Sequence, residues 1–167
     1  SLIGTSRAID SGAVSLILAL SPAWKESSWF GVRTAEQAMV VMAKAYELGF
    51  GITTAFDFLY VITTGTSTRI VLSPKGALAL IYRSGLLDGA TFKIEEKPGE
   101  CYVYMRRLDN GYGFGLTFTI DQARKAGLVR KGGAWEMYEP NMLRWRAIGY
   151  CSDIVFPDVK GGLGQAD

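Results

Sequence analysis

The segment CYVYMRRLDNGYGFGLTFTI, residues 101–120, decides the fold expected for this chain. Residues 101–107 and 112–120 are rich in aromatic and β-branched side chains, a composition that favours strands. LDNG lies between them and is a turn signal, because Asn and Gly adopt the positive φ that tight hairpins need. Along the second strand, glycines and threonines alternate with a second set of residues, Tyr112, Phe114, Leu116, Phe118 and Ile120. The segment therefore predicts an antiparallel hairpin with one apolar face.

Two further regions upstream predict strands. Residues 91–96 form a third strand, joined to the hairpin by the turn sequence KPGE at 97–100. Residues 59–63 and 68–72 predict a separate hairpin, in which TGTS supplies the turn. A short helix or turn over residues 54–58 leads into it. The three later strands are expected to form a meander.

Helix boundaries are marked by capping residues. Thr34 and Gln37 make a capping box for a helix that ends at Gly49. Ser73 caps a second helix, which has proline at its first position and ends near residue 85. The remaining predicted helices cover residues 121–126 and a long segment from about 140 to just before Pro157.

These elements predict an α+β fold: a hairpin and helix, followed by a three-stranded antiparallel meander with packing helices. A chain of 167 residues is long enough for one domain with a real core. Residues 1–33 are expected to be an N-terminal arm or packed loop and a candidate subunit contact. Residues 34–157 are expected to form a single core domain, and residues 158–167 a flexible end.

Composition excludes several function classes. The chain has no histidine, so neither a Ser-His-Asp or Cys-His arrangement nor a His-containing zinc site is possible. It lacks a phosphate-binding G-x-x-x-x-G-K-[ST] loop, so ATP hydrolysis is not expected, and we predict no cofactor and no metal. No apolar run approaches the ~20 residues of a membrane span, which predicts no membrane partner. Two cysteines, without a ligand cluster, are expected to be free thiols in the cytoplasm.

The formal net charge of +2 is too small to indicate a nucleic-acid partner, so any basic surface must come from clustering. Residues 69–85, RIVLSPKGALALIYRSG, carry only cationic charges: Arg69, Lys75 and Arg83. On the helix after Ser73, Lys75 and Tyr82 share a stripe, with Arg83 beside it. Such a face suits a phosphate chain, with the tyrosine stacking on a base. The alternative is that these cations are solvated and neutralised by acids from elsewhere.

Other basic residues extend the candidate DNA-binding set. They are Arg106 and Arg107 at a strand end, Arg124, Lys125, Arg130 and Lys131 around the short helix and its following loop, and Arg144 in the final helix. Arg146 lies two positions after Arg144, about 200° away around the helix axis, so the two side chains diverge. We predict that Arg144 contacts DNA. Arg146 is expected to be structural, paired with Asp153 on nearly the same helix face.

Four segments together resemble the RecT family of phage and prophage single-strand annealing proteins. They are GITTAFDFLYVI, VLSPKGALALIYRSG, CYVYMRRLDNGYGFGLTFTIDQARKAGLV and WEMYEPNMLRWRAIGYCSDIVFPDVKGG. The resemblance runs in order from about Thr34 to Gly162. It implies a core similar to the β-β-β-α unit shared by ring-forming annealing proteins, including phage Redβ.

The resemblance also implies a function. Members of the family bind single-stranded DNA and anneal complementary strands without ATP during recombination and repair, as rings or helical filaments. The implied partners are single-stranded DNA, the annealed duplex, further copies of the chain and a phage-encoded exonuclease, in the cytoplasm of a bacterial host. No catalytic group is needed for annealing.

Two alternatives remain open. Asp88, Glu95 and Lys97 form D-x6-E-x-K, a pattern similar to the two carboxylates and lysine of metal-dependent nucleases. The same residues also fit a solvated hairpin. The other alternative is a phage assembly protein that binds no DNA and uses exposed apolar residues for lattice contacts.

Overall fold

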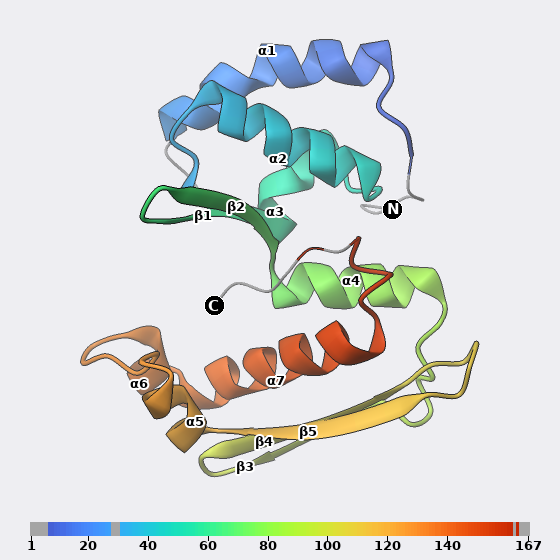
Figure 1. Cartoon of the computed structure of the whole chain (residues 1–167), viewed down its shortest axis with the longest axis vertical. Coiled ribbons are helices and arrows are strands. Elements are labelled where there is room, and N and C mark those ends of the chain that lie inside the picture. Colours follow the sequence, from blue (N-terminus) through green and yellow to red (C-terminus); the bar gives the residue numbers. More distant parts are fainter. Residues whose placement is uncertain (1–6, 28–30, 162, 164–167) are drawn as a thin grey trace. The chain divides into compact units, whose positions relative to one another are not determined.

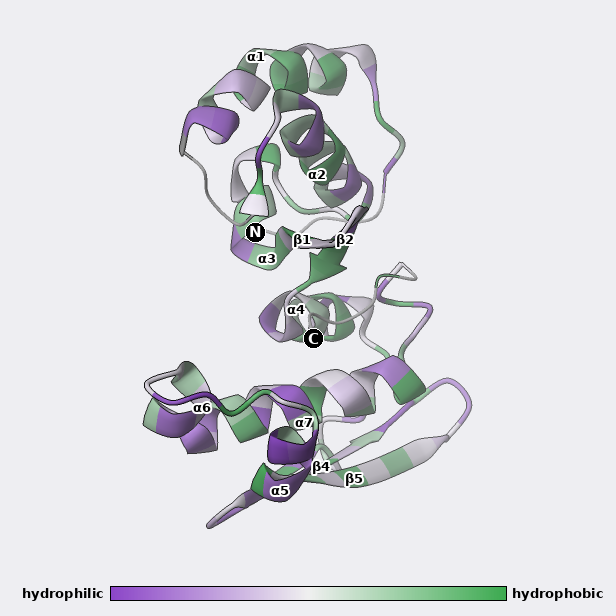
Figure 2. Ribbon diagram, turned by 60° about the vertical axis from the view of Figure 1, so that its left-hand side comes forward, coloured by the Kyte–Doolittle hydropathy of each residue, from purple (hydrophilic) through white to green (hydrophobic). Residues whose placement is uncertain are grey.

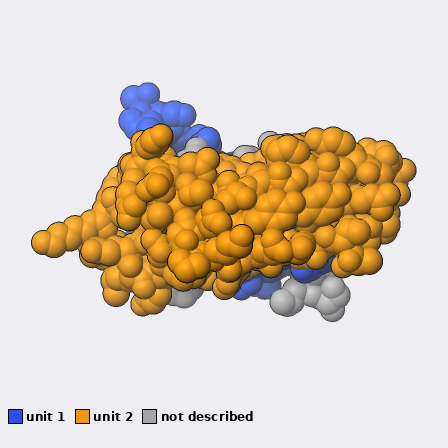
Figure 3. Space-filling model, turned by 90° about the horizontal axis from the view of Figure 1, so that it is seen from below, with its two compact units in different colours: residues 1–83, 161–167 blue, residues 84–160 orange. Residues whose placement is uncertain are grey.

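The computed structural model describes residues 7–27, 31–161 and 163 of the chain (Figure 1). The chain divides into two compact units, coloured separately in Figure 3. Unit 1 comprises residues 1–83 together with 161–167, and unit 2 comprises residues 84–160. The single domain expected over residues 34–157 runs across the boundary between them.

Unit 1 begins with helices. The helix α1 (Ser11–Ser27) packs against α2 (Ala35–Glu47), and the 3-10 turn η2 (Ile52–Thr54) and α3 (Ala55–Phe58) follow (Figure 1). As predicted, Thr34 caps α2: its hydroxyl accepts the N–H of Gln37 at 3.1 Å. Gly49 follows the helix with a φ of 90°, a conformation that glycine adopts without strain.

α1 stands where the sequence predicted an arm or a packed loop. The proline at position 22 lacks the N–H that would otherwise bond the Leu18 carbonyl. The helix nevertheless continues through the proline, and the hydroxyl of Ser21, which bonds the carbonyl of Ile17, also lies 3.3 Å from the Leu18 carbonyl and gives it a partial replacement for the missing donor. Figure 2 shows α1 as apolar along much of its length and polar toward Ser27. The rest of the predicted arm includes residues 1–6 and 28–30, which lie outside the described residues.

The hairpin and helix of unit 1 follow the prediction. β1 (Leu59–Thr64) pairs antiparallel with β2 (Ser67–Leu72), and a turn containing Gly65 at a φ of 60° joins them. α4 (Pro74–Ser84) follows, and the hydroxyl of Ser73 accepts the N–H of Gly76 at 3.0 Å. Gly85 then takes a φ of 70°, which ends the helix.

Unit 2 contains the predicted meander. β3 (Lys93–Lys97), β4 (Glu100–Arg106) and β5 (Gly113–Thr119) form an antiparallel sheet in the order β3-β4-β5. α5 (Ile120–Lys125) and α6 (Ala134–Met137) follow, and α7 (Glu139–Val155) lies across one face of the sheet (Figure 1). The sequence had predicted α5 and α7 but not α6. The α+β class is confirmed.

Alternation along β4 separates the two faces of this sheet. Cys101, Val103 and Met105 are buried, and they form the core of unit 2 with residues that include Leu143, Ala147, Ile148 and Cys151 of α7. Side chains of the opposite face are half-exposed or exposed. This second face, called the open face below, carries Lys93, Glu95 and Lys97 of β3, Glu100, Tyr102, Tyr104 and Arg106 of β4, and Gly113, Gly115, Thr117 and Thr119 of β5. Among the described helices, none is both long and apolar enough to cross a membrane.

Candidate nucleic-acid interface

The predicted cationic face of α4 is divided by the structure. Lys75 is exposed and Tyr82 is 57% exposed, and because they lie seven positions apart they point to nearly the same side of the helix. Arg83 instead donates from its guanidinium to the carbonyl of Leu48. Burial lowers the pKa of the Arg83 guanidinium. Lys75 and Tyr82 thus remain candidates for DNA contact, whereas Arg83 fastens α4 to the end of α2.

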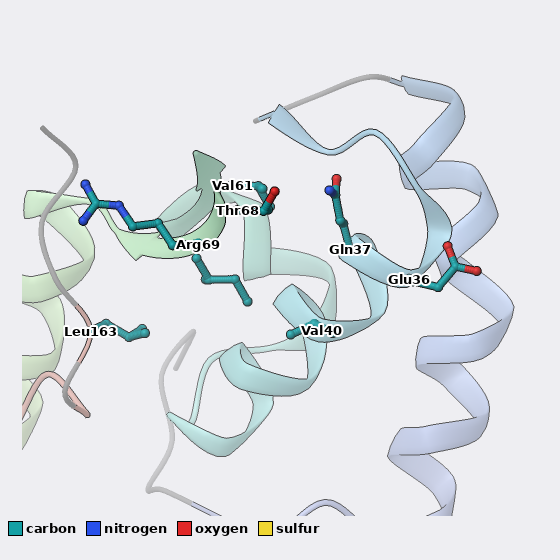
Figure 4. Close-up of a pocket in the computed structure, with 8 residues that line it drawn as sticks. Glu36, Gln37, Val40, Val61, Thr68, Arg69 and Leu163 are labelled. Carbon is teal, nitrogen blue, oxygen red and sulfur yellow. The ribbon is translucent and has the colours of Figure 1, made fainter. Parts of the chain in front are cut away.

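Arg69 is exposed on β2, at the rim of a pocket in unit 1 (Figure 4). The pocket has a volume of about 440 Å³ and is lined by Glu36, Gln37, Val40, Val61, Thr68, Arg69, Ile70 and Leu163. In Figure 4 the charged ends of Arg69 and Glu36 point to opposite sides of this lining. The walls between them are largely aliphatic, so the pocket suits apolar groups better than phosphates.

Three exposed or half-exposed arginines among the predicted DNA-binding residues of unit 2 already have acidic partners. The pairs are Arg106 with Asp88 at 3.0 Å, Arg124 with Asp121 at 2.9 Å, and Arg144 with Glu96. The hydrogen bond from Arg144 holds the pKa of Glu96 below its usual range. All three arginine side chains are more than a third exposed, so a phosphate would have to compete with these carboxylates.

Arg107 is buried, with 8% of its surface exposed, and its guanidinium makes five hydrogen bonds. Two go to the carboxylate of Asp109, two to that of Asp158 and one to the carbonyl of Val155, at 2.7–3.1 Å. A guanidinium has five N–H donors, so none is left for a phosphate. The structure therefore gives Arg107 a structural role, joining the turn after β4 to the end of α7, in place of the predicted DNA contact.

The chain after α7 is also held in place. Lys160 is 1% exposed, and its ammonium donates to the carboxylate of Asp153 and to the hydroxyl of Ser152. Together with the Asp158 bonds, this replaces the start of the predicted flexible end with fixed contacts. Residues 162 and 164–167 of that end lie outside the described part of the chain.

The predicted pair between Arg146 and Asp153 is not formed, because Lys160 occupies the carboxylate. Arg146 is half-buried and lies over the rings of Trp135 and Tyr150, at 5.8 and 5.6 Å from their centroids. Those rings attract the guanidinium through their π faces. Arg146 thus packs inside unit 2 against two aromatic rings.

The remaining predicted cations form what we call the α5 basic cluster: Lys125, Arg130 and Lys131. All three are exposed, and none makes an ion pair with any residue that the structure describes. They lie at the end of α5 and in the loop that leads to α6 (Figure 1). Thr119 and Gln122 form a capping box at the start of α5, which fixes the direction of this helix from β5.

Sequence reasoning missed two tyrosines on the open face. A Cβ atom on Gly115 would overlap the hydroxyl and ring of Tyr102, and one on Gly113 would overlap those of Tyr104. Each ring therefore lies diagonally across the neighbouring strand and is half-exposed. The alternation of CYVYM already placed both rings opposite the buried residues of β4, so the signal was present in the sequence. Beside them, Glu95, Lys97, Glu100, Tyr102 and Thr117 line a hollow of about 220 Å³.

The three residues of the nuclease alternative do not come together. The N–H of Asp88 donates to the carbonyl of Arg106, whereas Glu95 lies opposite Tyr102, four residues away along β4. Four residues of strand span about 13 Å, and a bound Mg²⁺ holds its ligands at about 2 Å. Within the described ranges, no group of three His, Cys, Asp or Glu side chains is placed to hold a metal ion.

No protein-family model matches the chain, and no curated protein sequence matches it.

Proposed function

We propose that this chain binds single-stranded DNA and anneals complementary strands without a nucleotide cofactor, as its resemblance to the RecT family implies. The observation that carries the proposal is the α5 basic cluster. Its three cations are exposed and lack acidic partners among the described residues, unlike Arg106, Arg124 and Arg144. Binding a phosphate chain there releases condensed counterions from the DNA without breaking an existing ion pair.

The open face offers a surface for the bases. The hydroxyl ends of Tyr102 and Tyr104 reach over glycines, and both side chains are half-exposed, as side chains that stack on bases must be. Stacking accepts every base and leaves the base-pairing edges free for a second strand, as annealing requires. The N–H of Ile120 donates to the carbonyl of Gly99 at 2.9 Å, so α5 begins beside the turn at one end of this face. The lysines of β3 on this face already have carboxylates beside them, since Lys93 forms an ion pair with Glu95 and Lys97 lies opposite Glu100, so we assign the phosphates to the α5 basic cluster.

Unit 1 offers a second, separate candidate contact at Lys75 and Tyr82 of α4. Assembly into a ring or helical filament and cooperation with a phage-encoded exonuclease also belong to this proposal, through the resemblance alone.

The salt dependence of DNA binding tests the α5 basic cluster. The triple variant Lys125→Gln, Arg130→Gln, Lys131→Gln and the wild type are titrated with a labelled oligonucleotide, with fluorescence anisotropy as the readout. Each lost phosphate contact lowers the slope of log affinity against log salt by about 0.7, so the slope should fall by about 2. A control variant, Lys25→Gln, Arg33→Gln, Lys44→Gln, removes the same charge elsewhere. Wild-type slope and affinity in the first variant would exclude the cluster from the interface.

The annealing activity is measured separately, with two complementary oligonucleotides that carry a fluorescence donor and acceptor. We expect annealing in the absence of any nucleotide, with both strands intact after incubation with Mg²⁺. Tyr102→Ala and Tyr104→Ala should slow annealing more than they change the salt slope, because stacking involves no counterion release. A requirement for ATP would contradict the proposal, and Mg²⁺-dependent strand cleavage would favour the nuclease alternative.

A further inference from the structure

The hydrogen-bonding phase of β5 follows from two bonds at its ends. The N–H of Arg107 donates to the carbonyl of Tyr112 at 2.8 Å, and the N–H of Ile120 donates to the carbonyl of Gly99 at 2.9 Å. In an antiparallel pair, alternate residues direct both backbone groups toward the partner strand. Residues 114, 116 and 118 of β5 thus bond to β4, and residues 113, 115, 117 and 119 direct their backbone groups away from it.

The outer side of β5 is an unpaired edge. The N–H of Thr119 is taken by the side chain of Gln122 at 2.9 Å. Among the residues that the structure describes, none bonds the backbone N–H or C=O groups that Gly113, Gly115 and Thr117 direct outward. An extended backbone is the partner that such a row of donors and acceptors fits.

The two edge strands of the sheet, β3 and β5, differ in how strongly they discourage pairing with another strand. β3 has the sequence KIEEK, with charges at all but one position, which discourages pairing with another strand. β5 has the sequence GFGLTFT and carries no charge. A strand that approaches β5 therefore meets no charged side chain on it.

We propose that β5 pairs antiparallel with β5 of a second copy of this chain, about a two-fold axis through Gly115. Gly113 then lies opposite Thr117 of the second copy, and Gly115 opposite its own equivalent. This register joins all the outward N–H and C=O groups of these residues in about six hydrogen bonds and leaves the Thr119 cap intact. The two three-stranded sheets become one, and the proposal does not depend on DNA binding.

The side chains of β5 favour a second copy as the occupant. Phe114 and Leu116 lie on the α7 side of the strand and are half-exposed. In the Gly115-centred register, Phe114 of each copy lies opposite Leu116 of the other copy. These are non-hydrogen-bonded positions, at which side chains on neighbouring strands approach most closely. Both apolar pairs thereby lose exposed surface. On the open face, the register brings glycine against glycine and threonine, which leaves room for the tyrosine rings.

Sedimentation velocity without DNA, over a range of protein concentrations, tests the proposal. Thr117→Pro removes an outward N–H but no hydrogen bond to β4, and Thr117→Val keeps the N–H as a matched control. We expect the wild type and Thr117→Val to dimerise, and Thr117→Pro to do so at least about tenfold more weakly. A wild type that stays monomeric overturns the proposal. So does self-association of undiminished strength in Thr117→Pro, which would point to another surface such as the exposed apolar residues Val14, Leu16 and Leu18 of α1.

Amide hydrogen exchange of the wild type provides a measurement that needs no variant to fold. The N–H groups of Gly113, Gly115 and Thr117 should exchange more slowly as the protein concentration rises, whereas those of β3 should not change. Exchange at these three amides that is fast and independent of concentration overturns the proposal, whatever the behaviour of Thr117→Pro.

Discussion

Replacing Arg107 by methionine should destabilise unit 2 and should affect DNA binding only through folding. Methionine preserves much of the apolar stem, but it removes all five guanidinium hydrogen bonds. The neighbouring Arg106→Met provides a matched control. Arg106 lies on the open face, its side chain is 42% exposed, and it forms an ion pair with Asp88.

The expected magnitude follows from what each partner loses. The carbonyl of Val155 is buried with its residue and loses the donor that Arg107 supplied, which costs about 1–3 kcal/mol. The side chains of Asp109 and Asp158 are 42% and 61% exposed, so both carboxylates rehydrate and their loss adds less than breaking a fully buried pair would. We therefore expect Arg107→Met to lower the free energy of unfolding by about 2–4 kcal/mol. Arg106→Met should lower it by less, about 1–2 kcal/mol, because the Asp88 side chain, although only 13% exposed, keeps the hydrogen bond from the N–H of Ala90.

Urea unfolding followed by circular dichroism measures both changes. The reactivity of Cys101 and Cys151 gives a second probe that is specific for unit 2, because both thiols are buried there. With an m-value of about 2 kcal/mol per molar urea, the middle of the usual range, the expected loss becomes a midpoint shift of about 1–2 M. Equal losses for the two arginine variants would refute the assignment of Arg107 as the buried structural link. So would an Arg107→Met variant of wild-type stability that has lost DNA binding.

Two further predictions concern titration. Hydrogen bonds from Arg107 hold the pKa values of Asp109 and Asp158 below their ordinary range, so the stability they contribute is fully present above the unfolded pKa of about 3.9. This stability is lost as the pH falls through the lowered pKa values of the folded state. The difference in stability between the wild type and Arg107→Met should therefore shrink below about pH 4. A difference that stays constant with pH would contradict this. Burial raises the pKa of Cys151 to about 11, so at pH 8 the smaller thiolate fraction alone should make alkylation in the folded protein at least about 200-fold slower than in urea. Similar rates in the two states would show an accessible thiolate.

The strands and most helices of the fold could be predicted because their signals are local. Thr34 and Ser73 cap the helices that the sequence assigned to them, and the glycines at 65 and 99 lie in the predicted hairpin turns. α1 was missed because Pro22 is a helix-breaking signal in the sequence. Its compensation, the bond from the Ser21 hydroxyl to the Leu18 carbonyl, becomes visible only in three dimensions.

The candidate site was harder to predict because the acids that neutralise two of its arginines come from segments distant in the sequence. The partners of Arg144 and Arg107 include Glu96 and Asp158, which lie 48 and 51 positions away. Nothing in the local sequence of either arginine indicates such a partner. The α5 basic cluster, by contrast, was identifiable from four cations within eight residues. Arg124 could have been set apart from the other three, because Asp121 lies three positions earlier on the same predicted helix.

The proposed base-stacking surface and the β5 edge meet at Gly115, yet different atoms would serve them. The missing Cβ of Gly115 leaves room for the Tyr102 side chain to reach across β5, whereas the N–H and C=O of Gly115 lie in the plane of the sheet and point outward. Tyr102→Ala therefore removes the ring and leaves the edge intact, and Thr117→Pro removes an edge donor and leaves the ring in place. Because each variant alters one surface, loss of annealing in the first and loss of dimerisation in the second are independent results. If both variants lost both properties, the two surfaces would be coupled through the position of β5.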